Sequence, residues 1–205
     1  LRLADVARQE GLDLRGSGVE RVMVAGEPGG SVPEIRARIE QAWPGAKVVD
    51  HHGMTEVGPV SFGDPADPAR LRIMHDRYYA EVLKPGGNEP VAPGESGEFV
   101  LTTLGRAACP LLRYRTGDLV KAIALPGEEP GAFALAGGIL GRVDDMVIVR
   151  GVNLYPAAVD AAIRAFGGVR EYQVEIDQRA TLPEVRLRFE AIEPMRELAA
   201  GLAAH

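Results

Sequence analysis

Cysteine is nearly absent from this sequence: Cys109 is the only one in 205 residues, so no intrachain disulfide can form. We therefore expect a reducing, cytoplasmic setting. Apolar runs of the ~20 residues that a membrane-crossing helix needs are also absent, so no membrane partner is expected. Lysine and arginine form no cluster and the net charge is −6, which argues against a nucleic-acid partner.

Glycine and proline, by contrast, are plentiful, with 25 and 15 residues, and they divide the chain into short segments. Residues 21–25 (RVMVA) predict a buried strand, and residues 46–50 (AKVVD) predict another. Between them, apolar residues at helical spacing predict a helix over residues 32–43. Ser31 and Glu34 have the spacing of a capping box at its start. The first part of the chain therefore predicts a strand–helix–strand unit.

The middle of the chain predicts a β-rich subdomain, because strand-like runs alternate with turn residues. These runs are residues 79–83, 97–103, 112–114, 120–125 and 133–140. The last third predicts a small α+β module. Its expected elements are a strand within 143–150, a helix beginning at Pro156 with a stripe reaching Phe166, alternating strands over 172–176 and 185–189, and a helix over 195–202.

The predicted fold class is therefore α/β: a strand–helix–strand portion and a β-rich subdomain, followed by a small α+β domain. We expect the first domain to cover residues 1–141 and the second, a mobile module, to cover residues 142–205.

The segment HHGMTE (residues 51–56) follows a predicted strand, and we expect it to be a polar loop. Open α/β folds bind ligands at the carboxyl ends of their strands. Gly53 allows close backbone approach, the Thr55 hydroxyl can bond a phosphate oxygen, and the Glu56 carboxylate can hold Mg²⁺. The alternative is a solvated loop that caps a helix.

Two further motifs carry polar residues beside glycines. In YRTGD, Asp118 follows a tight turn and can accept two hydrogen bonds from a ribose diol. In GRVDD, the Arg142 guanidinium suits phosphate or ribose oxygens, and Asp144 and Asp145 can form a hinge at the domain boundary. The alternatives are an ordinary Asp at a β-turn and a charged surface turn.

A zinc site is another hypothesis, because His75 and Cys109 are residue types that zinc prefers. Glu81 or His51 would be a further ligand, but the spacing matches no recognised zinc finger. The sequence therefore favours the structural alternative, a buried Cys109 and a half-exposed His75.

The order and spacing of these motifs resemble the adenylate-forming (AMP-binding) acyl-CoA synthetase superfamily. The matching segments are AGEP, VVDHHGMTEVGP, GESGEFVLTTLGR, CPLLRYRTGDLV and GRVDDMVIVRGVNLYP, spread over most of residues 22–160. Within this superfamily, PLLRYRTGD and RGVNLYP are most similar to phenylacetate-CoA ligases. The resemblance implies activation of an aryl, phenylacetate-like carboxylic acid with ATP and Mg²⁺ to an acyl-adenylate, and transfer of the acyl group to coenzyme A.

The resemblance also implies a role for each matching position. It places Gly26, Glu27 and Pro28 beside the adenine, Asp50 at the adenine amino group, Thr55 at the phosphate, Glu56 at Mg²⁺, Asp118 at the ribose diol, Arg142 at the nucleotide and Asp144 at the hinge. Gly53 and Gly151 complete the predicted nucleotide-binding set. His52 stands where the family usually has a stacking Tyr, so the adenine contact would have less area.

Two features of such ligases are not found in the sequence. Residues 1–21 contain no Ser/Thr/Gly-rich loop for the triphosphate, and the only lysines, Lys47, Lys84 and Lys121, all precede the predicted hinge. A catalytic lysine near the C-terminus is therefore missing. The expected explanation is a fragment of a ligase of about twice this length, with a naturally short protein as the alternative. We expect negligible adenylation by this chain alone.

Two other functions stay open from the sequence. One is an adenylating enzyme that passes its acyl group to an amine or a carrier, and the other is a non-catalytic nucleotide-binding or partner-binding module. If half of a ligase is missing, an apolar face of the strand–helix–strand unit is exposed. This predicts a homodimer or association with the missing half, and a clean monomer in sedimentation at high concentration would contradict it.

Overall fold

The computed structural model describes residues 2–25, 30–129, 131–145, 147–150, 152–156, 159–160, 162–163, 168–177 and 184–191. The chain divides into two compact units, residues 1–143 and residues 144–205, which are described separately below. Their assignment as the large and small domains of a ligase stays a prediction.

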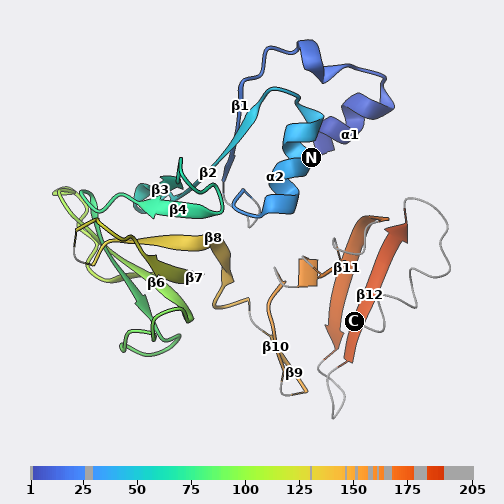
Figure 1. Cartoon of the computed structure of the whole chain (residues 1–205). Coiled ribbons are helices and arrows are strands. Elements are labelled where there is room, and N and C mark those ends of the chain that lie inside the picture. Colours follow the sequence, from blue (N-terminus) through green and yellow to red (C-terminus); the bar gives the residue numbers. More distant parts are fainter. Residues whose placement is uncertain are drawn as a thin grey trace. The chain divides into compact units, whose positions relative to one another are not determined.

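The first unit opens with the predicted strand–helix–strand arrangement. After α1 (Arg2–Gln9) and a short 3-10 helix η1 (Leu14–Gly16), β1 (Arg21–Ala25) and β2 (Lys47–Met54) pair in parallel, connected by α2 (Pro33–Ala42). Helix α2 lies alongside this pair of strands (Figure 1). The expected capping box is wrong: Val32 is the N-cap and no side chain caps the helix. The Ser31 hydroxyl donates to the Asp50 carboxylate instead, because it is buried beside β2.

The predicted polar loop over residues 51–56 is also largely wrong, because β2 continues through Met54. Residues 51–54 pair antiparallel with β3 (Gly58–Gly63), with His52 opposite Ser61. Only residues 55–57 form the turn between the two strands. The polar composition of this segment suggests a loop, but hydrogen bonds to β3 keep it in the strand.

One mixed sheet of eight strands organises the unit. Its order is β1-β2-β3-β4-β8-β7-β6-β5, and every pairing after the first is antiparallel. The remaining strands are β4 (Arg70–Ile73), β5 (Tyr78–Leu83), β6 (Ser96–Thr103), β7 (Tyr114–Ala124) and β8 (Phe133–Arg142). The predicted β-rich subdomain is thus confirmed.

Strand β7 differs from its prediction, since one long strand replaces two short ones over residues 112–114 and 120–125. It begins at Tyr114 and continues through Gly117 to Ala124. Register shifts against both β6 and β8 accommodate the local irregularity, so the pairing continues across the glycine.

The hydrophobic core of this unit lies on the antiparallel part of the sheet. Phe99, Leu101, Val120 and Leu135 are completely buried there. Most residues of β6 are buried on both faces, and its three consecutive apolar residues, Phe99, Val100 and Leu101, do not alternate with polar ones. The core therefore fixes the positions of β6 and β7, the strands beside the polar motifs.

The second unit contains two antiparallel hairpins. One pairs β9 (Val147–Val149) with β10 (Val152–Leu154), and the other pairs β11 (Val169–Asp177) with β12 (Glu184–Ala191). The two predicted alternating strands are confirmed in β11 and β12. Pro156 and residues 159–160 and 162–163 are helical, as expected, whereas Phe166 and the predicted helix over 195–202 lie outside the described residues.

Exposed apolar side chains occur on the edge strand of the sheet and on a loop. Met23 on β1 is 67% exposed, and Leu112, just before β7, is 78% exposed. Association through such surfaces stays a prediction. None of the helices in the described residues is long and apolar enough to span a membrane.

Candidate nucleotide site

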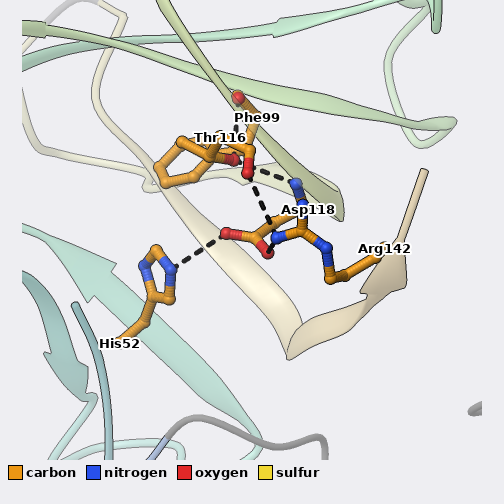
Figure 2. Close-up of polar contacts among 5 residues, drawn as sticks. All are labelled: His52, Phe99, Thr116, Asp118 and Arg142. Atoms are coloured by element: carbon orange, nitrogen blue, oxygen red, sulfur yellow. Dashed lines mark hydrogen bonds and ion pairs between the residues drawn. The ribbon is translucent and has the colours of Figure 1, made fainter. Parts of the chain in front are cut away.

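A buried carboxylate, Asp118, lies between a histidine and an arginine (Figure 2). His52 Nε2 lies 3.1 Å from Asp118 Oδ2, and Arg142 Nη1 lies 3.5 Å from Asp118 Oδ1. The side chains of His52 and Asp118 are only 8% and 11% exposed, whereas that of Arg142 is 47% exposed. The cluster thus combines a desolvated acceptor with a cation that reaches solvent.

The strand geometry explains how Asp118 and Arg142 meet. They are opposite each other in the register of β7 and β8. Gly117, just before the aspartate, has a φ of +75°, and a Cβ added there would lie 2.6 Å from Arg142 Nη2. A glycine is therefore needed both for the backbone turn and for the guanidinium to lie across it.

The Thr116 side chain holds the backbone of Asp118 by a hydrogen bond. Its Oγ1 accepts the backbone N–H of Asp118 at 3.0 Å and donates to the carbonyl of Phe99 at 3.0 Å. Arg142 also donates to the Thr116 carbonyl at 3.3 Å. These contacts tie Asp118 to the core strand β6, so its carboxylate is held by the least exposed part of the fold.

Because side chains alternate between the two faces along β2, two further predicted residues lie on one face of the sheet. Asp50 and His52 are separated by one residue in the strand and are both buried, in step with Val48. The His52 ring lies 5.9 Å from the Phe99 ring, tilted by 59°. The structure therefore brings His52, Asp118 and Arg142 together and places Asp50 on the same face of β2 as His52.

Asp50 is held by close packing and one strong hydrogen bond. Ser31 Oγ donates to Asp50 Oδ2 at 2.6 Å. A Cβ added to Gly30 would lie 2.4 Å from Asp50 Cγ, so the backbone must be glycine where it crosses this carboxylate. Burial raises the pKa of Asp50 above its ordinary value of 3.8, although the Ser31 hydrogen bond acts in the opposite direction.

The raised pKa predicts how Asp50 affects stability. Because the folded state holds this proton more tightly than the unfolded state, the free energy of unfolding decreases as pH rises from 3.8 through the raised pKa. Asp50→Asn has no titrating group at this position, so its free energy of unfolding lacks this decrease. The difference, variant minus wild type, should therefore increase across this pH window and then level off. Urea unfolding over a pH series measures it, with the exposed Asp76→Asn as control; a difference that falls with pH would contradict it.

Thr55 and Glu56 lie on the exposed turn between β2 and β3. The Glu56 carbonyl accepts a hydrogen bond from Arg106 at 2.9 Å, which holds the backbone of the turn. Among the described residues, no group of three or more metal-ligating side chains occurs. A single exposed carboxylate still fits Mg²⁺, since proteins commonly hold this ion through one or two carboxylates plus water and substrate phosphates.

Other predicted site residues are separate from the cluster or outside the described residues. Gly53 packs closely on β3, where an added Cβ would lie 2.8 Å from the Gly58 carbonyl oxygen. Asp144 is exposed and is the first residue of the second unit. Gly26, Glu27, Pro28 and Gly151 lie outside the described residues. The nucleotide-binding and hinge roles of these residues stay predictions.

The structure gives the two proposed zinc ligands other surroundings. His75 Nε2 lies 3.2 Å from the backbone N of Phe133 and 3.1 Å from its carbonyl oxygen. Cys109 is exposed, so the expected burial is wrong. Its apolar neighbours suggest burial, but the segment lies between β6 and β7, outside the sheet.

Three buried hydroxyl side chains beside the candidate site are missed or misassigned by reasoning from the sequence. Ser31 binds Asp50 rather than a helix terminus, and Thr116 supports Asp118. Ser61 is 1% exposed and lies opposite His52 in the register of β2 and β3. Thr116 could have been noticed as part of the TGD motif, whereas only strand pairing identifies Ser61.

Sequence and fold comparisons show that the chain is similar to part of the CoA ligases that act through an acyl-adenylate. The chain is 35% identical to phenylacetate-CoA ligase of Thermus thermophilus over 94% of its length, and 33% identical to that of Escherichia coli over 93%. It covers 43% of each, so it spans less than half the length of the curated relatives that it matches. The predicted resemblance to phenylacetate-CoA ligases is thereby confirmed.

Solved structures agree with this assignment. A 2-hydroxyisobutyryl-CoA ligase in the postadenylation state, in complex with 2-HIB-AMP, matches with a TM-score of 0.82 and 34% identity, over 98% of this chain and 42% of that one. An anthranilate CoA ligase in complex with anthranoyl-AMP matches with a TM-score of 0.65 but 19% identity, which supports the fold alone. No protein-family model matches the chain.

Proposed function

We propose that this chain forms the adenosine-binding and hinge portion of an ATP-dependent aryl-acid CoA ligase acting on a phenylacetate-like carboxylic acid. The observation that carries the proposal is the buried Asp118 carboxylate, which β7 presents between His52 and Arg142. The intact enzyme would form an acyl-adenylate and then a coenzyme A thioester. Because the chain spans less than half of its relatives, we propose that it has negligible adenylation activity alone.

In this proposal, each residue of the cluster acts through a property of the structure. The Asp118 carboxylate accepts hydrogen bonds from the ribose hydroxyls, in a desolvated place where such bonds are strong. Arg142 is half exposed, so its guanidinium can contact the nucleotide while it stays beside Asp118. Asp50, which directly precedes the two histidines of β2, accepts from the adenine amino group.

The exposed turn between β2 and β3 supplies the phosphate contacts. The Thr55 hydroxyl bonds a phosphate oxygen, and the Glu56 carboxylate holds Mg²⁺. When bound, the metal would neutralise negative charge on the phosphates. Asp144, at the start of the second unit, is the proposed hinge between the two half-reactions. The similar 2-hydroxyisobutyryl-CoA ligase has been solved in a postadenylation state and in a thioesterification state, which supports this role.

Calorimetric titration of the full chain tests the proposal. AMP and a non-hydrolysable analogue of phenylacetyl-adenylate are expected to bind, and the analogue more tightly because it adds the acyl group. GMP is the control, since it has the same ribose and phosphate but lacks the adenine amino group that Asp50 is proposed to recognise. A folded chain that binds neither adenine nucleotide, or that binds GMP equally well, would contradict the proposal.

Glu56→Gln is expected to leave stability unchanged and to abolish the effect of Mg²⁺ on ATP binding. The side chain lies on an exposed turn, so its replacement should change the free energy of unfolding by less than ~0.5 kcal/mol. Titrations of ATP with and without Mg²⁺ measure the metal effect in each protein. Glu95→Gln, also at an exposed turn, is the matched control, and a Glu56→Gln chain that still responds to Mg²⁺ would remove this carboxylate from the site.

The two other functions are less well supported. Phenylacetate-CoA ligases match this chain at 33% and 35% identity, whereas an amide bond synthetase matches at 21% identity, which shows the fold alone. A cytoplasmic location is part of the same proposal, because the exposed thiol of Cys109 suits a reducing compartment.

A further inference from the structure

The imidazole of His52 contacts the Asp118 carboxylate, which is the group proposed to bind the ribose. Its Nε2 lies 3.1 Å from Asp118 Oδ2, with both side chains about nine-tenths buried. A carboxylate can only accept hydrogen bonds, so Nε2 must carry the proton in this pair. A ribose hydroxyl that donates to Oδ2 therefore shares this oxygen with His52, or displaces it.

The two oxygens of Asp118 differ in this respect. Oδ1 faces Arg142 Nη1 at 3.5 Å, a long contact from a side chain that is 47% exposed. Oδ2 has the shorter contact, from a histidine that β2 and the neighbouring Phe99 ring hold in place. A hydroxyl that reaches Oδ1 therefore adds to a long contact, whereas a hydroxyl that reaches Oδ2 meets an oxygen that His52 already partners at short distance.

We propose that His52 is a specificity-determining residue that relaxes selection for one of the two ribose hydroxyls. A site rejects a ligand that lacks a hydroxyl when the loss leaves a buried polar group without a partner. Here the partner is restored, because His52 donates to Oδ2 whenever the hydroxyl is missing. This inference rests on the proposed function, since it requires that Asp118 binds the ribose.

Two unpartnered atoms support the view that Asp118 supplies the only hydrogen bond to the His52 ring among the described residues. Its Nδ1 is buried and has no hydrogen-bond partner among the described residues, and the same holds for Ser61 Oγ on the adjacent strand. With no second polar contact to fix the ring, the imidazole can leave Oδ2 at the loss of one hydrogen bond. The strand pairing holds the backbone of β2 in either case.

The test compares AMP with 2′-deoxy-AMP and 3′-deoxy-AMP by calorimetry on the full chain. For the wild type, one of the two deoxy analogues should bind nearly as well as AMP. In His52→Phe, which keeps a ring but no donor, the affinity ratio of AMP to that analogue should rise roughly tenfold, the size of one hydrogen bond to a charged group. His52→Gln restores a donor and should lower the ratio again.

Control variants separate this effect from a structural one. His51→Phe makes the same change one residue earlier, where no contact with Asp118 exists among the described residues, and should leave the ratio unchanged. In an Asp118→Asn background, His52→Phe should no longer alter the ratio. His52→Leu, a second variant without a donor, serves if His52→Phe does not fold.

The outcomes distinguish the two proposals. If AMP binds to the wild type and Asp118→Asn weakens it, while His52→Phe leaves the sugar ratio unchanged, the inference about His52 is wrong and the proposed function stands. The inference about His52 is also wrong if His52→Phe changes the ratio equally in the Asp118→Asn background. If no adenine nucleotide binds to the folded wild type, the proposed function falls, and the inference falls with it.

Discussion

Asp118→Asn is expected to weaken AMP binding about a hundredfold while the chain stays folded. The amide keeps the shape of the carboxylate but loses the charge that strengthens hydrogen bonds to the ribose hydroxyls, which are worth about 1.5–3 kcal/mol each when charge-assisted. One such bond at full strength, together with the smaller net gain from the hydroxyl beside His52, accounts for a loss of about 3 kcal/mol. Calorimetric titration gives the dissociation constants directly.

The surroundings of Asp118 determine the design of this experiment. The residue is buried and contacts both His52 and Arg142, so Asp118→Ala would remove an acceptor from each of them and leave a cavity in the sheet. Asparagine is therefore the sharper change. Asp76→Asn, at an exposed aspartate paired with Arg77, is the matched control and should bind AMP as the wild type does. Equal affinities in Asp118→Asn and the wild type would remove Asp118 from the site.

Phe99→Ala should produce the largest loss of stability, about 3–5 kcal/mol. The ring is 0% exposed and lies on β6, where both faces are buried, so its removal leaves a cavity that the neighbouring strands cannot fill. Such a loss is a large part of the roughly 5–15 kcal/mol by which domains are usually stable. Urea unfolding followed by fluorescence measures it, because the single tryptophan, Trp43, lies in the same unit.

Phe62→Ala is the matched control for that prediction. It makes the same chemical change in the same sheet, but Phe62 on β3 is 40% exposed, so part of its ring already contacts water. We expect its effect on the free energy of unfolding to be less than half that of Phe99→Ala. Equal losses in the two variants would show that the core does not lie where the structure places it.

The two main variants also probe how the site depends on the fold. Phe99 supports the cluster in two ways: its ring lies beside His52, and its carbonyl accepts from Thr116. A cavity at this position should therefore loosen the strand that presents Asp118. Asp118→Asn, by contrast, leaves the support intact and changes only the acceptor.

The sequence can predict the elements of the fold wherever side-chain periodicity and turn residues agree. The strand–helix–strand start, β5, β6, β8 and the hairpin of β11 and β12 all follow from local patterns. The composition of residues 51–54 predicts a loop, because glycine and polar residues disfavour strands, and pairing with β3 overrides that preference. The two short strands expected around Gly117 are one strand, because β6 and β8 pair with β7 on either side.

The residues of the candidate site are also accessible from the sequence, but their contacts are not. The motifs identify Asp50, His52, Asp118 and Arg142 through their resemblance to a family, and these residues come from three separate segments. That Ser31 binds Asp50 and that His52 lies against Asp118 could not be predicted, because these pairs are 19 and 66 positions apart and meet only in the folded chain.

The sequence by itself determined the resemblance to phenylacetate-CoA ligases, because several motifs of that family occur here in the same order along the chain. It also determined where glycine must allow the backbone to turn, as at Gly117. Only the tertiary structure decided which side chain contacts each oxygen of Asp118. That decision depends on strand order and register, which bring β2, β7 and β8 into one sheet through pairings between distant segments.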